Sequence, residues 1–107
     1  MSYTREGIMA QVCVAFGQGT GATRVSQEAC MALYGRYSQM ITDQVVADWE
    51  TQAVQALERI RALGRMVAAQ THLAGQTVVS ADQVKAAAPQ VELNSDTYIC
   101  QTPQGPA

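Results

Sequence analysis

Proline is absent from the stretch between Ser26 and Ala74, which holds only two glycines, Gly35 and Gly64. Proline and glycine are the residues that most often interrupt a helix, so the composition of the stretch gives little reason for a break. Apolar residues recur there every three or four positions, which is the period of an α-helix. The stretch therefore predicts one very long central helix with Ser26 as its N-cap. Its apolar stripe consists of Cys30, Leu33, Tyr34, Tyr37, Met40, Ile41, Val45, Trp49, Ala53, Leu57, Ile60, Leu63, Val67 and Ala74.

This predicted helix cannot bury its apolar stripe by itself, and the segments on either side of it are short. We therefore expect a second copy of the chain to cover the stripe. The expected fold class is all-α: a short helix, a very long central helix and another short helix, in an intertwined homodimer or higher oligomer. The long helices are expected to cross antiparallel. The expected dimer-interface residues are Tyr37, Ile41, Val45, Trp49, Leu57 and Ile60.

The segment before the central helix is expected to be a short helix. Apolar residues fall at helical spacing between Thr4 and Phe16. Val12, Val14 and Phe16 also alternate as in a strand, and this alternative stays open, although the sequence offers no evident partner strand. Glycines at positions 17, 19 and 21 then predict a flexible loop between helices. The loop lacks the lysine and the preceding strand of a phosphate-binding Walker motif.

The segment after the central helix carries several turn and cap signals. Gly75 is expected to end the central helix through a left-handed turn. Thr77–Val79 is β-prone but short, and Ser80 is expected to cap a last short helix that ends near Pro89. We therefore expect a helical dimerisation domain over residues 1–88 and an extended tail over residues 89–107, with an apolar cluster at Tyr98–Cys100.

Excess positive charge, histidine clusters and paired cysteines are also missing. Seven Lys and Arg against nine Asp and Glu leave a net charge of −2, which argues against a surface that coats nucleic acid. His72 is the sole histidine, and no cysteine pairs with it at the spacing of a zinc site. The three widely spaced cysteines indicate reduced thiols. The sequence therefore predicts no catalytic residues, no metal and no cofactor, and we expect the protein not to be an enzyme.

Long hydrophobic runs are absent as well. No stretch approaches the roughly 18 uninterrupted apolar residues of a membrane span. The N-terminal residues lack the basic region and the apolar run of a signal peptide. We therefore expect a cytoplasmic protein that does not contact membranes. If the protein binds DNA, we expect it to be nucleoid-associated or nuclear.

Two segments resemble the loops of histone-fold proteins, and are closest to those of archaeal-type histones. Residues 21–26, Gly-Ala-Thr-Arg-Val-Ser, are similar to the first loop, and residues 72–84 to the second loop and the start of the last helix. The resemblance implies a dimer in which the first loop of one chain lies beside the second loop of the other. It implies weak binding to the backbone of double-stranded DNA through Arg24, Ser26, Gln76 and Thr77.

The chain departs from the family pattern in length and in charge. It is longer between Ser26 and Thr77 by about eighteen residues, which corresponds to about five helical turns. Gly75 and Gln76 replace a basic pair, which removes phosphate-binding charge and the family's salt bridge to the position of Asp82. Two functions therefore stay open: a divergent histone-like DNA-binding or chromatin-associated protein, and a non-enzymatic structural or adaptor protein that self-assembles through its long helix without nucleic acid.

Overall fold

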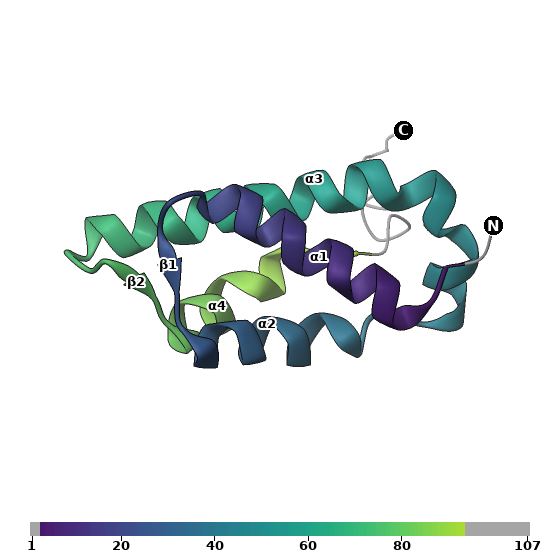
Figure 1. Cartoon of the computed structure of the whole chain (residues 1–107), viewed down its shortest axis with the longest axis horizontal. Coiled ribbons are helices and arrows are strands. Elements are labelled where there is room, and N and C mark those ends of the chain that lie inside the picture. The colour runs from purple at the N-terminus through teal and green to yellow at the C-terminus, as the bar shows by residue number, and fades with distance from the viewer. Residues whose placement is uncertain (1–2, 94–107) are drawn as a thin grey trace, which may run out of the picture.

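The computed structural model describes residues 3–93, which form a largely helical domain (Figure 1). Its elements are α1 (Arg5–Thr20), β1 (Arg24–Val25), α2 (Gln27–Ser38), α3 (Asp43–Leu73), β2 (Val78–Val79), α4 (Ala81–Ala87) and the 3-10 helix η1 (Ala88–Gln90). Helix α1 packs along α3, and α4 packs against α2. The strands and the starts of α2 and α4 lie at one end of the molecule, and the link from α2 to α3 lies at the other (Figure 1). The expected helical class with a long central helix is confirmed.

The prediction of one continuous helix from Ser26 to Ala74 is wrong, because the chain turns between Ser38 and Asp43. The hydroxyl of Thr42 caps α3 by accepting a hydrogen bond from the amide of Val45 at 3.3 Å. The guanidinium of Arg5 donates to the carbonyl of Ile41, which the break deprives of a helical partner. The turn folds α2 back beside α4, so that the apolar faces of the helices cover one another within a single chain.

That folding back changes the position of the residues expected at a dimer interface. Five of the six are buried within the chain itself: Tyr37, Ile41, Val45, Trp49 and Ile60. The sixth, Leu57, is half-buried and packs against the same core. The burial that the sequence analysis assigned to a second copy is therefore supplied by the chain's own helices. A dimer stays a prediction, and it requires either another surface or another arrangement of these helices.

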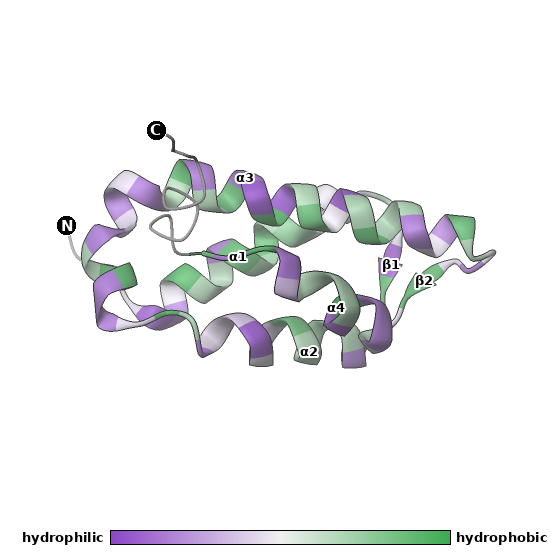
Figure 2. Ribbon diagram, turned by 180° about the vertical axis from the view of Figure 1, so that it is seen from behind, coloured by the Kyte–Doolittle hydropathy of each residue, from purple (hydrophilic) through white to green (hydrophobic). Residues whose placement is uncertain are grey.

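Helix α1 is longer than expected and continues through Gly17 and Gly19 to Thr20, so the predicted glycine loop and the alternative strand are both wrong. The helix ends at Gly21, whose φ of 61° is the left-handed conformation that glycine adopts easily. Figure 2 shows hydrophobic and hydrophilic positions alternating along the helices. Each helix therefore has an apolar side for the shared core, although some apolar side chains, such as Val14 of α1, stay exposed.

The second half of the chain follows its local signals closely. Helix α3 ends at Leu73, Gly75 has a φ of 74°, and Ser80 caps α4. The compact domain continues beyond the expected boundary at residue 88, because η1 follows α4 directly and the side chain of Leu93 is fully buried. The remainder of the expected tail, with the apolar cluster at Tyr98–Cys100, lies outside the described residues.

Candidate functional site

The two loops that resemble histone loops meet in one chain. Strand β1 pairs in parallel with β2, with Arg24 opposite Val78 and Val25 opposite Val79. The amide of Ser26 extends this ladder by donating to the carbonyl of Val79 at 3.0 Å. The loops therefore lie side by side as the resemblance implies, although the resemblance placed them in two different chains.

The four residues predicted to contact DNA lie at this end of the molecule. Ser26, Gln76 and Thr77 line an open groove of about 590 Å³, and Arg24 is exposed on the adjoining strand. The hydroxyl of Ser26 is already engaged, because it accepts a hydrogen bond from the amide of Ala29 at 3.0 Å and caps α2. Gln76 and Thr77 are exposed, and the groove is also lined by the apolar side chains of Val78 and Val79 and by Glu28.

Charge around this groove does not favour an anion. Arg24 makes no ion pair with a carboxylate among residues 3–93. Glu28 in the first turn of α2 and Asp82 in the first turn of α4 bring two exposed negative charges to the same end. These carboxylates offset the positive ends of the two helix dipoles. The predicted residues therefore lie at one end of the molecule, where two exposed carboxylates accompany Arg24.

A polar cluster behind the loops escaped the sequence analysis. The side-chain oxygen of Gln83 accepts from the amide of Ser80 at 2.9 Å and lies 2.9 Å from the hydroxyl of buried Thr71. His72 lies 3.0 Å from the hydroxyl of Thr23, so it links the end of α3 to the first loop. The Ser-x-x-Gln spacing of a capping box was a signal for the first contact. No sequence signal links His72 to Thr23, which are 49 positions apart.

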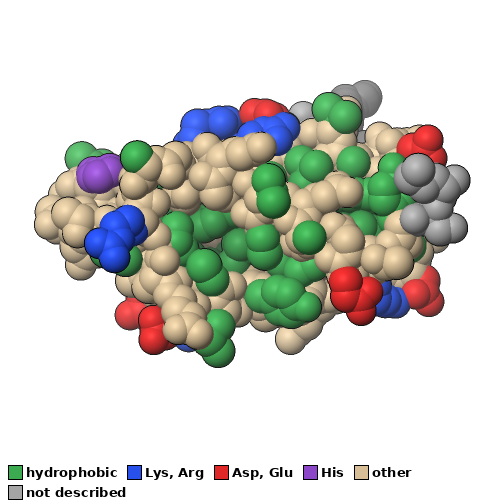
Figure 3. All heavy atoms as spheres, in the orientation of Figure 1, with side chains coloured by type: hydrophobic (Ala, Val, Ile, Leu, Met, Phe, Trp, Pro, Cys, Tyr) green, Lys and Arg blue, Asp and Glu red, His purple; other side chains and the backbone are tan. Residues whose placement is uncertain are grey.

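A second surface lies along the contact between α1 and α3. Ala10 and Val14 of α1 and Leu57 of α3 line a shallow groove of about 300 Å³, and Val54 lines an adjoining hollow. We call this surface the outer groove. The side chains of Val14 and Val54 are 60% and 77% exposed. Figure 3 shows hydrophobic side chains gathered over the middle of this face, with charged groups toward its margins.

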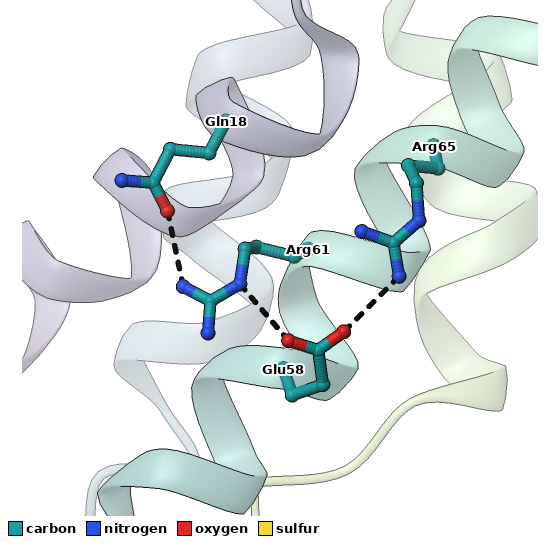
Figure 4. Close-up of polar contacts among 4 residues, drawn as sticks. All are labelled: Gln18, Glu58, Arg61 and Arg65. Carbon is teal, nitrogen blue, oxygen red and sulfur yellow. Dashed lines mark hydrogen bonds and ion pairs between the residues drawn. The ribbon is translucent and has the colours of Figure 1, made fainter.

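A charged network borders the outer groove (Figure 4). Glu58 accepts hydrogen bonds from Arg61 at 3.1 Å and from Arg65 at 3.2 Å. These contacts hold the pKa of the Glu58 carboxyl below its usual range, with the bond from Arg65 as the largest cause. Arg61 also donates to the side-chain oxygen of Gln18 at 3.0 Å and so ties α3 to α1. These charges therefore pair with one another at the surface.

The described residues offer little for catalysis or for a metal. Within residues 3–93, no group of three or more His, Cys, Asp and Glu side chains is arranged to hold a metal ion. Cys13 and Cys30 are free and exposed. Partial burial and, secondarily, the nearby Cys30 raise the pKa of the Cys13 thiol, which therefore stays protonated near neutral pH. No helix of the described part is long and apolar enough to cross a membrane.

Comparison with known proteins adds no relative, because no family model, curated protein or solved structure matches the chain.

Proposed function

We propose that the chain is a non-enzymatic structural or adaptor protein that associates with further copies of itself. The observation that supports this proposal is the outer groove, where Val14, Val54 and Leu57 form an apolar surface across two helices. Apolar surface bordered by polar groups is typical of protein–protein contact sites. Glu58 and Arg65 bring charges of both signs to its margin, so that two copies related by a two-fold axis can pair unlike charges.

The proposal is tested by the solution mass of the full chain and of two groove variants. Light scattering at micromolar concentration is expected to give more than one chain per particle. Val14→Glu and Val54→Glu place a charge in the apolar contact and are expected to reduce the mass to that of one chain. Met31→Glu is the matched control, because Met31 is 65% exposed on α2, away from the outer groove. A wild-type mass of one chain, or equal effects of all three substitutions, would overturn the proposal.

A second candidate function is weak, sequence-independent binding to the DNA backbone, as in a divergent histone-like protein. It is supported by the pairing of β1 with β2, which gathers Arg24, Gln76 and Thr77 at one end of the molecule. Glu28 and Asp82 oppose it, since they repel phosphate. For this reason we rank DNA binding below self-association.

A gel shift at low salt tests this second function. Wild type is expected to bind weakly, Arg24→Ala to weaken binding further, and Gln76→Lys to strengthen it, all with steep salt dependence. Arg36→Ala is the matched control, because it removes a cation from the last turn of α2, at the opposite end of that helix from Ser26. If wild type does not bind and Gln76→Lys creates no binding, the DNA hypothesis is wrong.

A further inference from the structure

The tertiary contacts of this domain connect two halves of the chain on either side of one turn. Helix α1 packs on α3, β1 pairs with β2, and α2 packs on α4. In each pair the first partner ends at or before residue 38 and the second begins at or after residue 43. The helix pairs and the strand pair could therefore form equally well between two chains if the turn at residues 39–42 straightened.

The turn itself has a sequence that suits a helix. Residues 39–42 are Gln-Met-Ile-Thr, without glycine or proline, and Gln39 already has helical backbone angles. The apolar residues at positions 33, 37, 41, 45 and 49 keep steps of four across it, as one helical stripe would. No residue of the turn therefore excludes a continuous helix here, and the observed turn is maintained by other contacts.

Three side-chain contacts stabilise the turn. The hydroxyl of Thr42 caps α3, and Arg5 donates to the carbonyl of Ile41 and pairs with Asp43. In a continuous helix the carbonyl of Ile41 would accept from the amide of Val45, and neither the cap nor the Arg5 contact would be needed. These contacts therefore favour the turned conformation over the straight one.

We propose that two copies of the chain exchange halves, with residues 39–42 becoming helical and joining α2 and α3 into one helix. Residues 3–38 of one copy then pack on residues 43–93 of the other. The core contacts are the same in both forms, so the equilibrium depends on the turn and on protein concentration. This inference takes the self-association proposed above as its starting point, but it leaves the outer groove exposed and predicts a different effect of mutations.

Removal of the cap is the first test, read out by analytical ultracentrifugation of the full chain refolded at high concentration. Thr42→Ala removes the cap of the turned form and improves helix propensity in the straight form. Since each dimer has two such turns, the dissociation constant is expected to fall by about 30-fold. Thr51→Ala is the matched control, because Thr51 is an exposed threonine inside α3. The proposal would be overturned if Thr42→Ala changed the dissociation constant no more than Thr51→Ala does, or if neither variant formed a dimer.

A proline at position 43 provides the opposite test. Asp43 is the first residue of α3, where proline is well accepted, and Thr42 has the extended backbone (φ −79°, ψ 171°) that a following proline requires. Asp43→Pro therefore fits the turned form but interrupts the straight helix, and it is expected to raise the dissociation constant by roughly ten-thousand-fold. Asp43→Ala controls for loss of the contact with Arg5. Circular dichroism verifies that both variants fold.

A cross-link identifies which chains are paired. Arg24 and Val78 are register partners in the strand ladder, and such partners lie at a distance that a disulfide can span. In a chain with serine at positions 13, 30 and 100, Arg24→Cys with Val78→Cys is expected to give covalent dimers when the dimer fraction is oxidised. Bonds within one chain would overturn the exchange. A dimer that persists in Asp43→Pro and is lost in Val14→Glu would also overturn it, while leaving self-association through the outer groove intact.

Discussion

Two glycines set the distance between α1 and α3. A Cβ atom on Gly19 would collide with the backbone carbonyl of Arg61, and one on Gly64 would lie 2.5 Å from the carbonyl oxygen of Phe16. Both obstacles are backbone atoms, which cannot move aside as a flexible side chain can. The close approach of the helices therefore requires glycine at both positions.

We predict that Gly19→Ala and Gly64→Ala each lower the free energy of unfolding by about 1–3 kcal/mol, because the helices must separate. Gly17→Ala is the matched control on α1, since its Cβ would meet nothing within 4 Å. This control is expected to raise stability by up to about 1 kcal/mol through helix propensity. Urea denaturation monitored by circular dichroism measures all three. Equal effects at positions 17 and 19 would contradict the close approach.

Trp49 is the largest fully buried side chain. Its indole N–H donates to the side-chain oxygen of Gln11 at 3.0 Å, which joins α3 to α1. We predict that Trp49→Ala lowers the free energy of unfolding by about 3–5 kcal/mol. Gln11→Ala leaves the indole N–H without this partner and is expected to cost about 1–3 kcal/mol. A loss below about 0.5 kcal/mol for Trp49→Ala in chemical denaturation would show that this side chain is not in the core.

The phenol of Tyr37 makes the free energy of unfolding depend on pH in the alkaline range. Its hydroxyl lies 3.3 Å from the carbonyl of Ala88 and 3.1 Å from that of Val91, and burial raises its pKa. The unfolded chain loses this proton near pH 10, whereas the folded protein retains it to higher pH. The stabilisation is therefore complete below about pH 10 and is lost as the pH rises further. We predict that Tyr37→Phe shows a smaller loss of stability above pH 10 than wild type and than Tyr34→Phe, an exposed control. Equal pH profiles would contradict this.

At the scale of elements, α4 is too short to be stable alone and depends on its cap. Ser80 and Gln83 form a capping box, and Gln83 also contacts Thr71 of α3. Local capping and tertiary packing thus share one side chain. The orientation of α4, and with it the position of β2 and the loop groove, depends on Gln83.

We predict that Gln83→Ala lowers the free energy of unfolding by about 1–3 kcal/mol, because it leaves the Thr71 hydroxyl and the Ser80 amide without one partner each. Ser80→Ala, which removes the cap alone, is expected to cost about 1 kcal/mol. Gln70→Ala, at an exposed position of α3, serves as the control and is expected to change little. Thermal and urea denaturation measure these differences. A loss for Gln83→Ala no larger than that of the control would show that the contact with Thr71 contributes nothing.

At the scale of the whole molecule, the segment after α4 joins α2 to α3. Arg59 of α3 donates to the carbonyls of Glu92 and Leu93 at 3.0 and 3.3 Å, and Arg36 of α2 pairs with the carboxylate of Glu92 at 3.6 Å. Leu93 is fully buried. The segment therefore completes the core on the side where α2 and α3 diverge.

We predict that a chain ending at Leu93 is more stable than a chain ending at Ala87, since it retains the contacts of residues 88–93. A chain ending at Ala87 loses the burial of Ala88 and Leu93 and is expected to be less stable by about 2–5 kcal/mol. Differential scanning calorimetry compares the two truncations. Equal stability of both would place the end of the folded domain at α4.

Much of the local structure could be predicted from the sequence, and less of the site. Ser26, Gly75 and Ser80 mark helix ends because a cap acts through residues within one turn of it. The glycines at 17 and 19 wrongly predicted a loop, since both lie inside α1, and only Gly19 of the two serves the close approach to α3. Arg24 and Thr77 were expected near each other through the family resemblance, and they are, but in a single chain. No pattern in the sequence predicted the outer groove or the contact between His72 and Thr23, because each joins segments that are distant along the chain.

By itself the sequence determined the helical class, the caps at Ser26 and Ser80 and the end of the long helix near Gly75, because these depend on periodicity and on neighbours along the chain. Only the tertiary structure decided that the central helix turns at residues 39–42. The residues there do not exclude a helix, but folding α2 back onto α4 buries Tyr37 and Ile41 within the same chain. Burial of apolar surface outweighs the few hydrogen bonds lost at the turn, and Thr42 and Arg5 replace part of that loss.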